Sequence, residues 1–152
     1  MAIVGTIKYM FSSLLSPSKR MAVGFEDMKH AVSNPSKFII INTLLGNDQD
    51  ILIRGTIPLE REEMAINEQL TNYTAPDLPI IVYGRNSSDL TVDAKQTQLR
   101  SLGIKDVYVY AGGLFEWLLL GEVYGADEFK IDNRGHKHSI DILRYRANPV
   151  LK

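Results

Sequence analysis

Short, continuous apolar runs alternate along this chain with longer segments in which apolar residues recur at helical spacing. The runs are rich in β-branched residues and are flanked by turn-forming residues, which is typical of strands covered on both faces. They comprise Phe38–Ile41, Ile51–Ile53, Ile80–Tyr83 and Val107–Tyr110. The helical spacing predicts helices over Phe25–Val32, Pro58–Leu70, Thr91–Leu102 and Leu114–Leu120, and we expect the last two to end at Gly103 and Gly121.

This alternation predicts an α/β fold with a mainly parallel central sheet and helices on both faces. Ligand sites in such folds lie beyond the carboxyl ends of the strands, which here lead into the segments Asn42–Gly46, Gly84–Leu90 and Ala111–Gly113. We expect three parts along the chain. Residues 1–20 form an amphipathic helix and linker, residues 21–126 form the domain, and residues 127–152 form a C-terminal extension packed on it, with a loop and a final helix or strand.

The first 20 residues carry one apolar stripe at helical spacing. It comprises Ile3, Ile7, Met10, Phe11, Leu14 and Leu15. No acidic residue precedes Glu26, whereas Lys8, Lys19 and Arg20 are basic. We expect a helix from about Ile7 to Leu15 whose apolar face is covered by the domain. The alternatives are contact with a second copy in a homodimer, contact with a membrane surface, and targeting to an organelle.

Composition narrows the function classes. The 152 residues are 45% hydrophobic and 23% charged with a net charge of −1, an ordinary balance that gives no bulk attraction to nucleic acid or anionic membranes. No apolar run approaches the roughly 20 residues that span a bilayer. The chain has no cysteine, which excludes disulfides, thiolate metal sites and cysteine catalysis. We expect a cytoplasmic protein without a cofactor.

Three weaker signals have structural interpretations. His136 and His138 are spaced like metal ligands but lack a nearby carboxylate pair, so we expect no metal site. Trp117 is flanked by leucines and a phenylalanine, which favours a place in the core over a recognition surface. The charged run Arg61–Glu63 is interpreted as the solvated face of a helix.

Two motifs resemble the rhodanese homology domain. The strand Ile80–Tyr83 runs into the small polar loop Gly84–Asp89, and the next strand is followed by Gly112-Gly113 with Trp117 and Gly121. The resemblance covers about Phe25–Gly125. It implies a single rhodanese-like domain, a fold in which active members carry a nucleophilic cysteine at the end of this strand.

The chain departs from that family at the positions that matter for sulfur transfer. Gly84 stands where the cysteine is expected, and Asn42 and Thr43 stand where an aspartate–arginine pair is usual. Asp89 stands where a second arginine is common, which leaves Arg85 as the positive residue of the loop. The resemblance therefore implies a vestigial active-site loop, made of Gly84, Arg85, Asn86, Ser87, Ser88 and Asp89, and no enzyme activity.

The loop residues have interpretations from their own chemistry. In active relatives a cradle of backbone N–H groups and a helix N-terminus hold an anion and lower the thiol pKa. A carboxylate at Asp89 would be stabilised by the same donors and would compete with an external anion. Ser87 and Ser88 have no histidine near them in sequence, so we interpret their hydroxyls as partners of the loop backbone. Gly84 is expected to supply a positive φ or a close backbone approach.

These features predict a non-catalytic rhodanese-like domain that acts as a protein-interaction or regulatory module. The expected docking surface combines Gly84–Asp89 with Thr43–Arg54 and Ala111–Leu114. A protein partner is expected and a nucleic acid is not. The alternatives are an anion or small-molecule sensor that uses the N–H cradle and Arg85, and an enzyme of another class in the old pocket. An open loop favours the sensor, and a loop closed by Asp89 favours the docking module.

Overall fold

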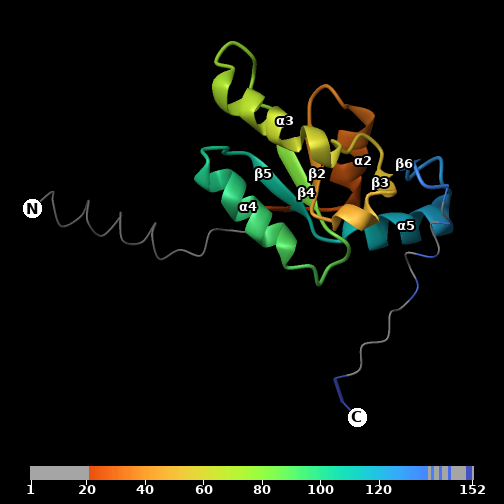
Figure 1. Ribbon diagram of the computed structural model, residues 1–152. Coiled ribbons are helices and arrows are strands. Elements are labelled where there is room, and N and C mark those ends of the chain that lie inside the picture. The colour runs from red at the N-terminus through yellow and green to blue at the C-terminus, as the bar shows by residue number, and fades with distance from the viewer. Residues whose placement is uncertain (1–20, 137, 139–140, 142–143, 145–149, 152) are drawn as a thin grey trace, which may run out of the picture.

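Four parallel strands form the centre of the molecule in the order β1-β5-β4-β2 (Figure 1). The computed structural model describes residues 21–136, 138, 141, 144, 150 and 151, so the helix expected over residues 7–15 and most of the segment after residue 138 lie outside the described residues. The strands are β1 (Ala22–Val23), β2 (Ile39–Asn42), β4 (Ile80–Tyr83) and β5 (Val107–Tyr110). The parallel register confirms the predicted sheet.

Helices cover both faces of this sheet, as the sequence pattern predicts. On one face lie α2 (Phe25–Ser33) and α5 (Gly113–Tyr124), and on the other lie α3 (Leu59–Thr71) and α4 (Thr91–Ser101) (Figure 1). Successive strand residues point to opposite faces, so β2, β4 and β5 each contribute side chains to two separate hydrophobic clusters. Ile81 and Tyr83 pack with α2 and α5, whereas Ile80 and Val82 pack with α3 and α4. Burial on both faces explains why the strands are continuously apolar.

A second, two-stranded antiparallel sheet lies beside the first. It pairs β3 (Ile51–Ile53) with β6 (Ile131–Asn133), and the short 3-10 helix η1 (Gly46–Asp48) precedes β3. Between α5 and β6 the chain buries Phe129, whose ring centroid lies 5.0 Å from that of Trp117. Trp117 is fully buried and its indole N–H donates to Lys130 O at 3.1 Å. Trp117 is therefore a core residue, as predicted.

Two sequence-based predictions about the helices are wrong. α5 continues past Gly121 to Tyr124, and Gly125 ends it with a φ of 107°. Gly121 instead faces Phe129, because an ideal Cβ on it would lie 3.5 Å from Phe129 Cβ. Glu62 is buried rather than solvated, and its carboxylate pairs with Lys95 of α4. A charge pattern along one helix could not show this, because the partner belongs to another helix.

Candidate functional site

The loop Gly84–Asp89 lies at the carboxyl end of β4 and leads into α4. Its first two carbonyl groups accept hydrogen bonds from the start of α5: Leu114 N–H donates to Gly84 O at 2.9 Å, and Phe115 N–H donates to Arg85 O at 2.8 Å. Gly113 permits this contact, because it has a φ of 67° and an ideal Cβ on it would lie 2.8 Å from Gly84 O. The two glycine-containing motifs of the sequence therefore meet in space.

Asp89 fills the centre of this loop. Its Oδ2 accepts the N–H of Arg85 at 3.0 Å, and its Oδ1 accepts the N–H of Thr91 at 3.0 Å and the Thr91 hydroxyl at 2.6 Å. Burial alone would raise the pKa of Asp89, but these hydrogen bonds, first that from Arg85 N–H, bring the pKa below its ordinary value. The carboxylate thus takes donors at the start of α4 that an external anion would use.

Asn86 satisfies further donors of the same loop. Its side-chain Oδ1 accepts the N–H of Ser88 at 3.0 Å, and its carbonyl oxygen accepts the N–H of Asp89 at 3.2 Å. Ser87 and Ser88 themselves are exposed. The loop is therefore held closed by its own side chains and backbone, with Arg85, Ser88, Asp89 and Thr91 N–H groups all engaged by internal acceptors.

Arg85 is paired with an acid that sequence reasoning missed. Its Nη1 lies 3.3 Å from Oδ2 of Asp48 in η1, a residue 37 positions earlier, and about a third of each side chain is exposed. A pair this exposed contributes little to stability. It does offset the positive charge that an external anion would need, and the Asp89 carboxylate accepts the backbone N–H of the same residue.

Asn42 and Gln49 form a neutral pair where the family resemblance implies a charged one. Asn42 Nδ2 donates to Gln49 Oε1 at 3.0 Å, and Gln49 Nε2 donates back to Asn42 Oδ1 at 2.7 Å. The Asn42 Oδ1 also accepts the N–H of Leu44 at 3.1 Å. These bonds fold the segment after β2 back on itself. The sequence showed that the usual aspartate–arginine pair is missing at positions 42 and 43. It did not show that Gln49 forms hydrogen bonds with Asn42.

One of the two roles expected of Gly84 is found. Its φ does not lie in the positive range, so that part of the expectation is wrong, whereas a close approach to this residue is observed. The space beside it is taken by side chains: an ideal Cβ would lie 2.5 Å from Asp89 Oδ2 and 3.1 Å from Thr43 Oγ1. Glycine is required here because Asp89 and Thr43 are already in place.

A cavity of about 510 Å³ adjoins the loop between α3 and α4. The hydroxyls of Thr43 and Thr91, which lie 2.8 Å apart, line it together with the Glu62–Lys95 ion pair. Leu59 at its rim is 47% exposed. Leu45 and Leu90, which flank two of the lining residues, are 70% and 79% exposed. This edge of the sheet therefore presents apolar side chains around a closed polar loop.

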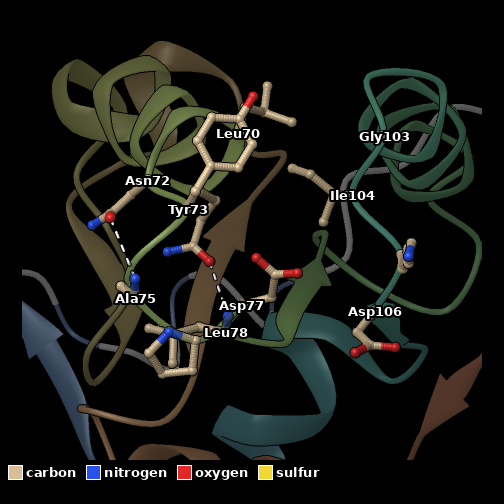
Figure 2. A pocket seen from close by; sticks show the side chains of 12 residues that line it. Leu70, Asn72, Tyr73, Ala75, Asp77, Leu78, Gly103, Ile104 and Asp106 are labelled. Atoms are coloured by element: carbon tan, nitrogen blue, oxygen red, sulfur yellow. Dashed lines mark hydrogen bonds between the residues drawn. The ribbon is translucent and has the colours of Figure 1, made fainter.

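A second cavity, of about 500 Å³, lies at the opposite edge of the sheet (Figure 2). It is lined by Leu78 from the segment before β4, by Ile104 from the segment before β5, and by Tyr73. Leu78 N–H donates to the side chain of Gln69 at 2.9 Å. Sites in parallel sheets lie at carboxyl strand ends, and this cavity lies at the amino ends of β4 and β5. It brings together none of the predicted site residues.

In the part of the chain that the structure describes, there is little support for serine–histidine catalysis, a metal site or a membrane-spanning helix. His30 packs edge-on against the ring of Phe38, which precedes β2 at the edge opposite to Ser87 and Ser88. Among residues 21–136, 138, 141, 144, 150 and 151, no three histidine or acidic side chains gather as metal ligands would. Over the same residues, no helix has both the length and the apolar character that crossing a bilayer requires.

The comparisons with known proteins agree with this geometry. Residues 48–120 match the model of the rhodanese-like domain family. A search of curated proteins found no match. Among solved structures, the BH2092 protein from Bacillus halodurans is 16% identical with a TM-score of 0.52, and the match covers 77% of this chain and 81% of that one.

Two further structures are similar to this chain. A protein from Lactobacillus plantarum is 17% identical with a TM-score of 0.51, covering 76% of this chain and 92% of that one. The single domain sulfurtransferase RDL2 from Saccharomyces cerevisiae is 17% identical with a TM-score of 0.52, covering 72% and 98%. Likenesses at this identity show the fold. The family match by itself gives a rhodanese-like domain at residues 48–120, the family that the motifs of this chain resemble.

Proposed function

We propose that this protein is a non-catalytic rhodanese-like domain that acts as a protein-interaction module. The observation that carries the proposal is the position of Asp89: in a chain without cysteine, its carboxylate accepts the N–H of Arg85 beside Gly84 and the N–H of Thr91 at the start of α4. Such a loop has no thiol nucleophile, and the N–H groups of Arg85, Ser88, Asp89 and Thr91 are already engaged and not available to a sulfur anion. The part of the loop that remains available for function is its outer surface.

That surface suits a protein partner. Leu45, Leu59 and Leu90 project from three separate segments at the carboxyl edge of the sheet, and each is at least 47% exposed. Apolar side chains around a rigid polar centre match the general make-up of protein interfaces. The internal hydrogen bonds of Asp89 and Asn86 fix the loop, so little ordering is required when a partner binds.

Two experiments test the proposal. Purified protein should show no thiosulfate:cyanide sulfurtransferase turnover above buffer, and measurable turnover would overturn the non-catalytic assignment. The second experiment uses proximity labelling in cells with the protein, a Leu45→Asp/Leu90→Asp variant, and a Tyr73→Asp control. Tyr73 is 95% exposed and lies at the opposite edge. A partner kept by the protein and the control but lost by the double variant supports the docking surface.

A labelling pattern that the double variant leaves unchanged would contradict this surface. The sensor alternative makes a separate prediction, because it requires the loop to bind a small anion directly. The pairing of Arg85 with Asp48 and the engagement of the loop donors by Asp89 favour the docking module over the sensor.

A further inference from the structure

The outer face of α5 carries an apolar stripe that the described residues leave exposed. Phe115, Leu119 and Val123 follow one another at four-residue intervals, which places them on one side of the helix, and they are 40%, 44% and 65% exposed. The inner face is buried through Leu114, Trp117 and Leu118. A helix with apolar residues on two faces normally buries both, so the outer stripe is a surface on which another segment can dock.

Residues 1–20 of the same chain carry a matching stripe. Ile7, Phe11 and Leu15 also follow at four-residue intervals. On a helix these three would span about 12 Å, the same length as the stripe from Phe115 to Val123. The two stripes are therefore alike in spacing, length and apolar character.

Charge favours this segment over a second copy of α5. α5 carries Glu116 and Glu122 and no basic residue, whereas residues 1–20 carry Lys8, Lys19 and Arg20 and no acidic residue. Burial, and then the charge of Glu26, raises the pKa of Glu116, and Glu26 is a further acidic residue near this end of α5. Two copies of α5 packed together would bring like charges close, which opposes that pairing.

The place where the described chain begins sets the direction of docking. Met21 O accepts the N–H of Val109 at 2.8 Å, so the chain enters beside β5, which leads directly into α5. The six residue steps from Leu15 to Met21 reach about 20 Å at most. An antiparallel helix puts Leu15 at Phe115, near the end of β5. A parallel one puts Leu15 at Val123, about 12 Å further along α5.

We propose that residues 7–15 form a helix that docks antiparallel on the outer face of α5 of the same chain. Ile7 then lies opposite Val123, Phe11 opposite Leu119 and Leu15 opposite Phe115. This contact is independent of the interaction surface at the carboxyl edge. It would also support the loop, because Phe115 N–H donates to Arg85 O.

The absence of cysteine permits a clean disulfide test in the full chain. The Phe11→Cys/Leu119→Cys variant is compared with Phe11→Cys/Thr97→Cys, in which the second thiol lies on the exposed side of α4. Under mild oxidation the first should close an intramolecular disulfide at a rate independent of protein concentration and about tenfold or more above the control, since a docked pair exceeds the millimolar effective concentration of a flexible tether. For direction, Leu15→Cys/Phe115→Cys should close and Leu15→Cys/Val123→Cys should not.

Three results would overturn the proposal. Equal closure in the paired and control variants would show an undocked segment. Disulfides formed only between chains would assign the stripe to a second copy. Binding of the unmodified protein to anionic vesicles, without closure of the paired variant, would assign it to a lipid surface. A readout without thiols is amide hydrogen exchange in α5: Phe11→Asp should accelerate it, and an unchanged rate would contradict docking.

Discussion

The carboxylate of Asp89 occupies the space that a side chain on Gly84 would need. An ideal Cβ at residue 84 would lie 2.5 Å from Asp89 Oδ2, and the same oxygen accepts the N–H of Arg85 at 3.0 Å. The position that lacks the sulfur nucleophile and the residue that closes the loop are thus in direct contact. Replacing Gly84 by a residue with a side chain while Asp89 is kept would therefore disrupt the loop.

Gly84→Ala should therefore destabilise the protein. The new methyl group would displace the Asp89 carboxylate from its donors, and we expect the free energy of unfolding to fall by about 1–3 kcal/mol, as for other overpacked sites. Gly46→Ala is the matched control, because a Cβ there meets nothing within 4 Å. Its effect should stay within about 0.5 kcal/mol. Urea denaturation of the two variants measures both.

The contact with Asp89 can be isolated by a double-mutant cycle. In an Asp89→Ala background the carboxylate is gone, so Gly84→Ala should cost clearly less than it does in the unmodified protein. The same urea transitions supply the coupling energy. An equal cost in both backgrounds would show that the strain at residue 84 has another source.

Gly113→Ala should be more destabilising than Gly125→Ala. Both glycines have a positive φ, which costs an L-residue about 1–2 kcal/mol. Only Gly113 also faces other atoms closely, with Gly84 O at 2.8 Å from an ideal Cβ, whereas a Cβ on Gly125 meets nothing within 4 Å. Thermal unfolding of both variants separates the two effects. Equal losses would mean that α5 does not hold the loop as described.

The hydrogen bonds of Asp89 make a pH-dependent contribution to stability. The pKa of Asp89 is lower in the folded protein than in the unfolded chain. Its contribution is therefore present above the unfolded value, about 3.9, and is lost as the pH falls through the folded value. The stability difference between the protein and Asp89→Asn should be largest at neutral pH and shrink below about pH 4. A difference that is constant over this range would contradict the pKa direction.

The fold could be predicted from the sequence because its strong signals are local. The runs Ile80–Tyr83 and Val107–Tyr110 coincide with β4 and β5, since strands buried on both faces must be apolar throughout. β1 and β6 were not predicted. β1 has two residues, too few to show a period, and β6 is set by its pairing with the distant β3. The residues of one segment alone do not predict such a pairing between distant strands.

The candidate site was predicted in part for the same reason. The sequence places Asp89 at the start of a helix, and the structure shows its carboxylate bound to Thr91 N–H. The pairs Arg85–Asp48 and Glu62–Lys95 join residues far apart in the sequence, so only the fold reveals them. The expected positive φ at Gly84 was wrong, and what restricts this position is the space taken by the side chains of Asp89 and Thr43.

Gly84→Cys would place a single thiol in the chain, which makes its pKa measurable by alkylation at different pH values. Next to the Asp89 carboxylate, the thiol pKa should stay at or above its ordinary value of about 8.5. In Gly84→Cys/Asp89→Ser the repulsion is gone and the N–H groups of Arg85 and Thr91 are free, so the thiol pKa should fall. A low thiol pKa in the single variant would show that the cradle is intact despite Asp89.

The most direct test of a loop closed by Asp89 is calorimetric titration of the unmodified protein and of Asp89→Ala with thiosulfate. The unmodified protein should show no saturable binding in the millimolar range, because its carboxylate already holds the donors of Arg85 and Thr91. Asp89→Ala should gain binding, because those donors and the N-terminus of α4 become available to an external anion. Thiosulfate binding by the unmodified protein as tight as that of the variant would contradict the account.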